Sequence, residues 1–247
     1  MTRTSVLILL LALGGCVTTG TPVNKAKMAE GYYMKGLSHL QEKNYEMASV
    51  EFNRSIQTDS RYKQSYYGLG IISDYQGKVD DSRKYYEKAI DLDPDFSEAH
   101  NALGVVYSKQ QKWKEAANSF NKALANKLYT TPHLPYLNLG DLYMAQKDYA
   151  KAAEAYRESK RFVILELTIF KLGTALYEEG RIKDSIGEFQ EGVALAPQNA
   201  TMRYSLALAF LKDGNKKSAL AEFKKAAELA PRSEIAQKAN DYIKTLR

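Results

Sequence analysis

The 247-residue chain contains one cysteine, one tryptophan and no long apolar run. A single cysteine cannot form a disulfide bond within the chain, so the core alone has to hold the fold together. The longest apolar stretch, Val6 to Leu13, has eight residues, whereas a membrane-spanning helix needs about 20. The net charge is only +6. This is weak evidence for nucleic acid or anionic lipid as a partner and is typical of a solvated helical surface rich in lysine.

Motifs of common enzyme classes are also missing. The body of the chain has no glycine-rich phosphate loop and no G-x-S-x-G sequence. Three histidines are present, but none has a partner at the spacing of metal ligands; they are His39, His100 and His133. We therefore predict no enzymatic activity, no metal or cofactor site, no small-molecule substrate and no nucleic-acid partner.

The first residues have the parts of a secretory signal. Arg3 precedes the apolar run, and Gly14 and Gly15 follow it, as expected for a cleaved leader. The sequence "LGGC" then resembles the lipobox of bacterial lipoproteins. This resemblance implies a signal peptide over residues 1–15 and a covalent lipid on Cys16, whose two or three acyl chains anchor a protein stably. The alternatives are a plain secretory signal that ends in cysteine and a cytoplasmic protein with an apolar start.

Two further expectations follow from the lipobox. In the sorting rule of enterobacterial lipoproteins, an aspartate after the cysteine retains the protein at the inner membrane. Val17 stands there instead, so the resemblance implies a lipid-anchored protein of the outer membrane that faces the periplasm. Residues 16–28 lack apolar periodicity and contain threonine, glycine and proline. We predict that they are the lipidated cysteine and a flexible tether.

The rest of the chain repeats with a period near 34 residues. A glycine among apolar residues recurs at intervals of 34, 34, 36 and 33, and alanine takes its place in the sixth unit; the positions are Gly36, Gly70, Gly104, Gly140, Gly173 and Ala207. Each is followed by a second cluster of small and aromatic residues, such as Ala116 and Phe120. Both clusters have helical spacing. Because one helix pair cannot bury its apolar face alone, we expect the units to stack into a solenoid.

This pattern resembles the tetratricopeptide repeat (TPR), W-x2-L-G-x2-Y, then A-x3-F, then P. The resemblance implies an all-α fold, a right-handed superhelix of about six helix-turn-helix repeats, followed by a capping helix at 234–247 that Ser233 could cap. A stretched interval and two prolines predict a longer loop or a kink near 126–135. The expected repeats are 29–62, 63–96, 97–130, 133–165, 166–199 and 200–233.

In TPR solenoids the first helix of each pair lines a concave groove. The fifth and ninth positions of each unit usually point into it, and here they are mostly aromatic and aliphatic. The resemblance thus implies a protein-binding groove for an apolar peptide or an amphipathic helix. The alternative is that several of these side chains belong to the core between repeats. The candidate groove residues are Tyr33, Leu37, Tyr67, Ile71, Val105, Leu137, Phe170, Tyr204 and Leu208.

The whole arrangement is similar to the type IV pilus biogenesis lipoproteins of the PilF/PilW and Tgl type. This resemblance implies a non-enzymatic scaffold that acts as a pilotin, binding a secretin subunit and helping it to reach and assemble in the outer membrane. The alternatives are a periplasmic TPR adaptor for peptidoglycan enzymes and a component of outer-membrane protein assembly. Fold analogy alone does not identify the partner.

Overall fold

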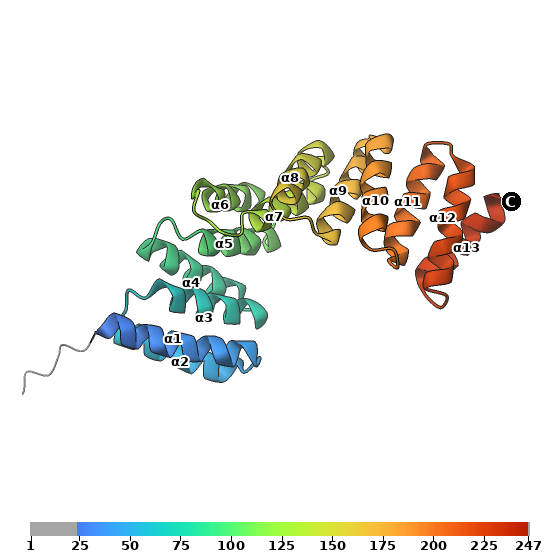
Figure 1. The fold of residues 1–247 in the computed structure, drawn as a ribbon. Coiled ribbons are helices and arrows are strands. Elements are labelled where there is room, and N and C mark those ends of the chain that lie inside the picture. Colours follow the sequence, from blue (N-terminus) through green and yellow to red (C-terminus); the bar gives the residue numbers. More distant parts are fainter. Residues whose placement is uncertain (1–23, 247) are drawn as a thin grey trace, which may run out of the picture.

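The computed structural model describes residues 24–246, so the predicted signal peptide and Cys16 lie outside the described residues. Within this range the chain forms thirteen α-helices and no strand. The helices are arranged as six pairs and a final single helix, which form a long curved array from α1 at one end to α13 at the other (Figure 1). The predicted all-α solenoid of about six helix pairs with a capping helix is confirmed.

The pairs alternate short helices of similar length. Odd-numbered helices are the first of each pair and even-numbered helices the second. The bounds are α1 Lys25–Gln41, α2 Tyr45–Thr58, α3 Lys63–Tyr75, α4 Val79–Leu92, α5 Ser97–Lys109, α6 Trp113–Ala125, α7 His133–Ala145, α8 Tyr149–Phe162, α9 Glu166–Glu179, α10 Ile182–Leu195, α11 Ala200–Lys212, α12 Lys216–Leu229 and α13 Glu234–Leu246.

Each pair is held together by an aromatic ring of the second helix that lies on a small residue of the first, which is glycine in five of the six pairs. In the third pair, a β-carbon added at Gly104 would come within 2.5 Å of Phe120 Cε1. The same close approach joins Gly36 to Phe52 and Gly173 to Phe189. Because even a methyl group would overlap the ring at these positions, the recurring glycine is the residue that lets the two helices and the ring pack.

The turn inside each pair has one residue with a left-handed backbone. Glycine occupies this position in three turns, for example Gly77 at φ 71°. Lysine or glutamine occupies it in the other three, as at Gln111 with φ 58°, where a residue with a side chain carries a conformational cost. The six turns therefore share one geometry, which the sequence satisfies with different residues.

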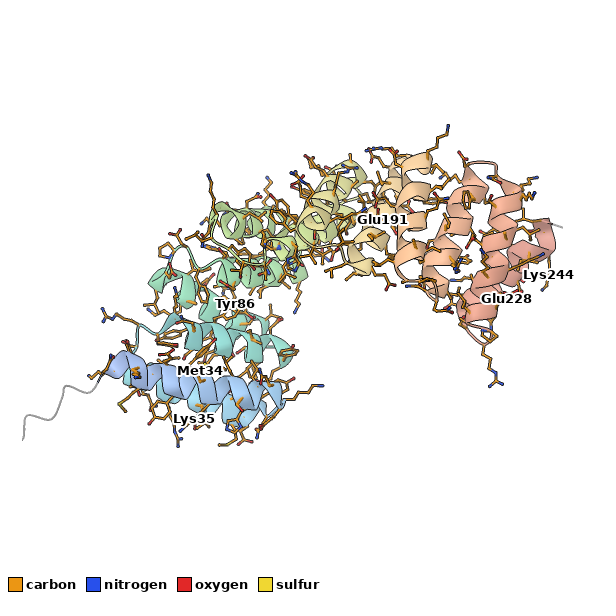
Figure 2. The ribbon with its side chains drawn as sticks, in the orientation of Figure 1. Met34, Lys35, Tyr86, Glu191, Glu228 and Lys244 are labelled. Carbon is orange, nitrogen blue, oxygen red and sulfur yellow. The ribbon has the colours of Figure 1, made fainter. Side chains whose placement is uncertain are left out.

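The helices at the two ends of the array differ in the residues that they expose and bury. Later repeats use apolar residues such as Leu103 and Val106 to pack on the preceding pair, but α1 has Lys35 and Ser38 at the matching positions, and both are exposed. Figure 2 shows Met34 and Lys35 on α1 and Lys244 on α13. At the far end, α13 packs its apolar face on the sixth pair, and the ring of Tyr242 stacks on Phe223 at 4.7 Å. Ser233 caps α13, because its Oγ accepts the Ala236 N–H at 3.1 Å.

Two predicted boundaries need correction. The tether was expected to run to residue 28, but α1 already begins at Lys25, because the Asn24 side chain caps it by accepting the Lys27 N–H at 3.2 Å. The irregular segment near 126–135 is a loop over residues 126–132, and α7 includes residues 133–135. Pro135 is tolerated there because the first turn of a helix does not use its N–H groups for internal hydrogen bonds.

Candidate protein-binding surface

The nine candidate groove residues all lie on odd-numbered helices, and all nine are half-buried. Each therefore shows one side to the core and another to solvent. Tyr33 illustrates this, since its ring lies 5.7 Å from Phe52 and 5.5 Å from Tyr62. Leu37 packs on the same core cluster. These side chains thus contribute to the core, and their role in binding a partner stays a prediction.

The first three repeats bring tyrosines together on this surface. The Tyr67 ring is 5.7 Å from Tyr86 and 5.4 Å from Phe96. Burial, followed by the electrostatic influence of Tyr129, Glu98 and Tyr33, raises the pKa of Tyr67 to about 12. Its hydroxyl thus stays protonated near neutral pH and can donate a hydrogen bond. We call Tyr33, Tyr62, Tyr67 and Tyr129 the tyrosine cluster.

Sequence reasoning missed two members of this cluster, Tyr62, which stands just before α3, and Tyr129. Tyr129 lies in the loop between α6 and α7, not on a helix, and only 8% of its surface is exposed. Burial raises its pKa above the ordinary value, and Glu98 adds to the effect. The signal was the tyrosine within the irregular "KLYTTP" segment. The stretched connection therefore supplies a side chain to the core beside the candidate binding surface.

The middle repeats contribute packing and polar links. Ile71, Val105 and Leu137 each pack against a separate core cluster. Neighbouring odd-numbered helices are joined by side-chain pairs that sequence reasoning also missed. Lys109 Nζ lies 2.7 Å from Asp74 Oδ1, Asn138 donates to Asn101 at 2.9 Å, and Lys171 Nζ lies 2.5 Å from Asp141 Oδ1. These pairs fix the spacing between helices that share the surface.

The last two repeats form a hollow of about 170 Å³ on this surface. It brings together two predicted residues, Phe170 of α9 and Leu208 of α11, with Phe189 as a third apolar wall. Tyr204 does not line the hollow; its ring meets Phe223 edge-on at 5.5 Å and lies 6.4 Å from the tilted ring of Tyr242. The polar lining is Thr174, Tyr177, Glu178 and Ser205. A hollow of this size and composition can hold one large apolar side chain of a partner.

Nothing in this surface has the arrangement of a catalytic or metal site. Within residues 24–246, no three His, Asp or Glu side chains gather as metal ligands. His100 is buried, its Nε2 lies 2.8 Å from the Pro94 carbonyl oxygen, and burial lowers its pKa. It is a packing residue. None of the described helices is long and apolar enough to cross a membrane.

Comparison with known families identifies the class. Models described as tetratricopeptide repeat or TPR repeat match residues 29–62, 75–111, 97–127, 135–161 and 170–234. The geometry above, helix pairs closed by an aromatic ring on a small residue, is that of this repeat. The chain belongs to the tetratricopeptide-repeat proteins.

Solved structures with the same fold include two pilus proteins. The Pseudomonas aeruginosa PilF structure is 20% identical, with a TM-score of 0.76 over 88% of this chain and 98% of that chain. PilW, described as a widely conserved type IV pilus biogenesis factor, is 18% identical, with a TM-score of 0.74 over 86% and 98%. YrrB, a TPR protein with an unusual peptide-binding site, is 20% identical, with a TM-score of 0.66 over 77% and 97%. The chain thus shares the fold of these three structures, one of which is a type IV pilus biogenesis factor.

A curated relative matches only locally. The human intraflagellar transport protein 88 homolog is 25% identical over 103 residues, which cover 38% of this chain. The match spans 12% of that protein's length. It is a likeness of repeats within a much longer protein.

Proposed function

We propose that the chain is a non-enzymatic, protein-binding lipoprotein that acts as a pilotin for a secretin of type IV pilus biogenesis. The observation that carries the proposal is the extent of the likeness to PilF and PilW, which covers 98% of both chains. A likeness that extends along almost the whole length of both chains is more specific than a shared repeat type. TPR surfaces generally bind proteins, and the half-buried aromatic residues described above suit an apolar segment of a partner.

Within this proposal the partner binds on the first three repeats, over the tyrosine cluster. Tyr33 and Tyr67 offer rings whose buried sides are already fixed by neighbouring aromatics, so little side-chain entropy is lost on binding. Rigid, partly buried tyrosines of this kind are frequent hot spots of protein interfaces. The lipid on Cys16 would hold the bound secretin subunit near the membrane where it assembles.

We expect Tyr67→Ala to weaken secretin binding by roughly ten- to thirtyfold, the loss typical of a hot-spot aromatic. Binding is measured by pull-down of the secretin from envelope extracts and by titration with the purified secretin domain. Tyr66→Ala is the matched control, because Tyr66 is the neighbouring residue on α3 and its hydroxyl bonds instead to the Ser60 carbonyl at 3.2 Å.

The cellular readout separates this function from the alternatives. Deleting the gene should leave secretin monomers where heat-stable multimers normally form, and the Tyr67→Ala variant should restore few multimers while Tyr66→Ala restores them. Unchanged multimers in the deletion strain contradict the proposal. Recovery of peptidoglycan hydrolases or of outer-membrane assembly factors, without secretin, would favour one of the other scaffold roles.

The proposed membrane anchor has its own test. Cys16→Ala removes the thiol that accepts the diacylglyceryl group, so the protein should appear in the soluble periplasmic fraction or remain unprocessed. Mass spectrometry of the wild-type N-terminus should find the acyl chains on Cys16, since two or more are needed for stable anchoring. An unmodified Cys16 thiol, or full membrane attachment of the Cys16→Ala variant, rules out lipidation.

A further inference from the structure

The starts of the odd-numbered helices, with the connections that precede them, lie along one edge of the solenoid. Side-chain bonds tie successive segments of this edge together. Lys63 at the start of α3 pairs with Asp93, and Asn126 donates to the Asp95 carbonyl at 3.1 Å. Asn199, the N-cap of α11, bonds to Glu166 at the start of α9. The edge begins at α1, where the chain enters the described part of the structure (Figure 1).

Exposed apolar residues concentrate on this edge. Among the described residues, twelve large hydrophobic side chains are exposed, and all but Met34, Met47, Val50 and Tyr75 lie at the end of an even-numbered helix, in the connection after it, or in the first turn of an odd-numbered helix. Six of these eight lie in the two connections on either side of the fourth pair or on the helix ends next to them. We call them the apolar edge: Leu128, Leu134, Phe162, Ile164, Leu165 and Leu167.

The two parts of the apolar edge lie next to each other. The two connections meet where α8 ends beside the start of α7, since Ser159 Oγ donates to the His133 carbonyl at 2.8 Å. The ring of Phe162 stacks on Tyr136 at 5.9 Å. Large exposed apolar patches mark sites where a protein contacts something else.

The shape of the apolar edge suits a deformable lipid surface better than a protein surface. Leu128 is 87% exposed and Ile164 is 63% exposed, so both project from turns, and neither lines the hollow between α9 and α11. Projecting apolar side chains enter the boundary between headgroups and acyl chains without needing a complementary pocket. A protein partner would instead have to supply pockets for each of them.

The charges near the apolar edge also suit a lipid surface. The connections before α3 and α5 carry Asp59, Asp93 and Asp95, whereas residues 126–132 and 163–165 contain no acidic residue and one lysine, Lys127. Arg161 stands at the end of α8 and pairs with Glu158 at 3.0 Å. Glu166 stands between Leu165 and Leu167, but its carboxylate accepts a hydrogen bond from Asn199. Anionic headgroups can therefore approach the two connections themselves without meeting a carboxylate within them.

We propose that the apolar edge is a second membrane contact, which lies on the lipid bilayer and sets the orientation of the solenoid. Cys16 precedes Asn24 by eight residues, which span at most about 28 Å. A lipid there keeps the array close to the bilayer, so this nearness rests on the proposed lipidation. The contact itself requires only the exposed side chains, and it would hold the binding surface at a fixed angle to the membrane.

A fluorescent reporter tests the contact in the lipidated protein. The single tryptophan, Trp113, is replaced by phenylalanine, and Ile164→Trp is introduced. In vesicles of phosphatidylethanolamine and phosphatidylglycerol, we expect blue-shifted emission and quenching by brominated lipid. The control is Tyr75→Trp, at the end of α3 on the opposite edge, where the 70% exposed side chain should remain unquenched. Equal quenching, or none, at the two positions overturns the proposal.

A second measurement does not depend on the anchor. The chain from Val17 to Arg247 keeps all thirteen helices, and we expect it to bind the same vesicles weakly. Leu128→Ser and Ile164→Ser should each reduce this binding by roughly tenfold, while Tyr75→Ser leaves it unchanged. Flotation of the lipidated form reports the anchor separately. If Ile164→Ser abolishes a dimer seen by sedimentation and vesicles are not bound, the edge is an interface between copies, and the proposal is wrong.

Discussion

Gly104→Ala is expected to destabilise the protein by about 1–3 kcal/mol, the usual cost of overpacking a core. The new β-carbon would stand 2.5 Å from Cε1 and 2.6 Å from Cδ1 of Phe120. The ring cannot move freely, because Phe120 is 1% exposed and packs against Leu139 and Leu142 of the next pair. Alanine in place of glycine stabilises the helix itself by about 1 kcal/mol. The measured change in the free energy of unfolding is therefore the cost of the clash minus this gain.

Gly187→Ala is the matched control and should change stability in the opposite direction. Gly187 also lies inside a helix, α10, but a β-carbon there meets nothing within 4 Å. Alanine should therefore stabilise by about 0.5–1 kcal/mol through helix propensity alone. Urea unfolding followed by circular dichroism measures both variants. If the two substitutions shift the midpoint in the same direction, the close approach of Phe120 to Gly104 is not what makes glycine necessary.

A second substitution tests the contact directly. Phe120→Leu replaces the ring by a smaller, flexible side chain, so it should cost stability alone but should relieve the clash that Gly104→Ala creates. The double variant is then less destabilised than the sum of the single changes. Such non-additivity is expected for residues in contact and not for distant ones.

The fold was largely predictable because the same packing of a small residue against an aromatic ring recurs in every unit. Gly104 and Phe120 are spaced as a small residue and a ring on facing helices, and five other units repeat that spacing. The exact start of α1 was not predictable in the same way. The residues before Lys25 have no repeat counterpart, and the cap by Asn24 is a single hydrogen bond.

The binding surface was harder to predict than the fold. A helical position that is exposed in one repeat can be covered by neighbouring side chains in another. Only the packing of the folded chain determines which of its side chains stay exposed. Tyr67 packs on Tyr86 and is also partly exposed to solvent, whereas Leu137 packs against the core around Tyr156. The apolar edge could have been recognised, because the connection "FVILEL" contains apolar residues where the connection "DPDF" of the second unit is acidic. The 3.6-residue period gives no information on such loops.

Phe120→Ala is expected to cost about 3–5 kcal/mol, the range for a buried phenylalanine truncated to alanine. Phe223→Ala should cost a similar amount, because both rings are almost completely buried. Their effects on unfolding should differ, however, because each pair in a solenoid is stabilised only by its neighbours. Phe120 joins the third and fourth pairs, whereas Phe223 joins the last pair to α13.

Loss of Phe223 should free only the end of the array. Hydrogen exchange of α11, α12 and α13 should accelerate, while the first ten helices stay protected, since terminal repeats fray independently. Loss of Phe120 should instead weaken the junction beside the seven-residue connection 126–132, so that the two halves unfold in separate steps. A single sharp transition with uniform loss of protection in both variants would mean that the thirteen helices unfold as one unit, and the neighbour-only description would fail. Separate steps in the Phe120→Ala variant alone would show that the middle junction couples the half that carries the tyrosine cluster to the half that carries most of the apolar edge.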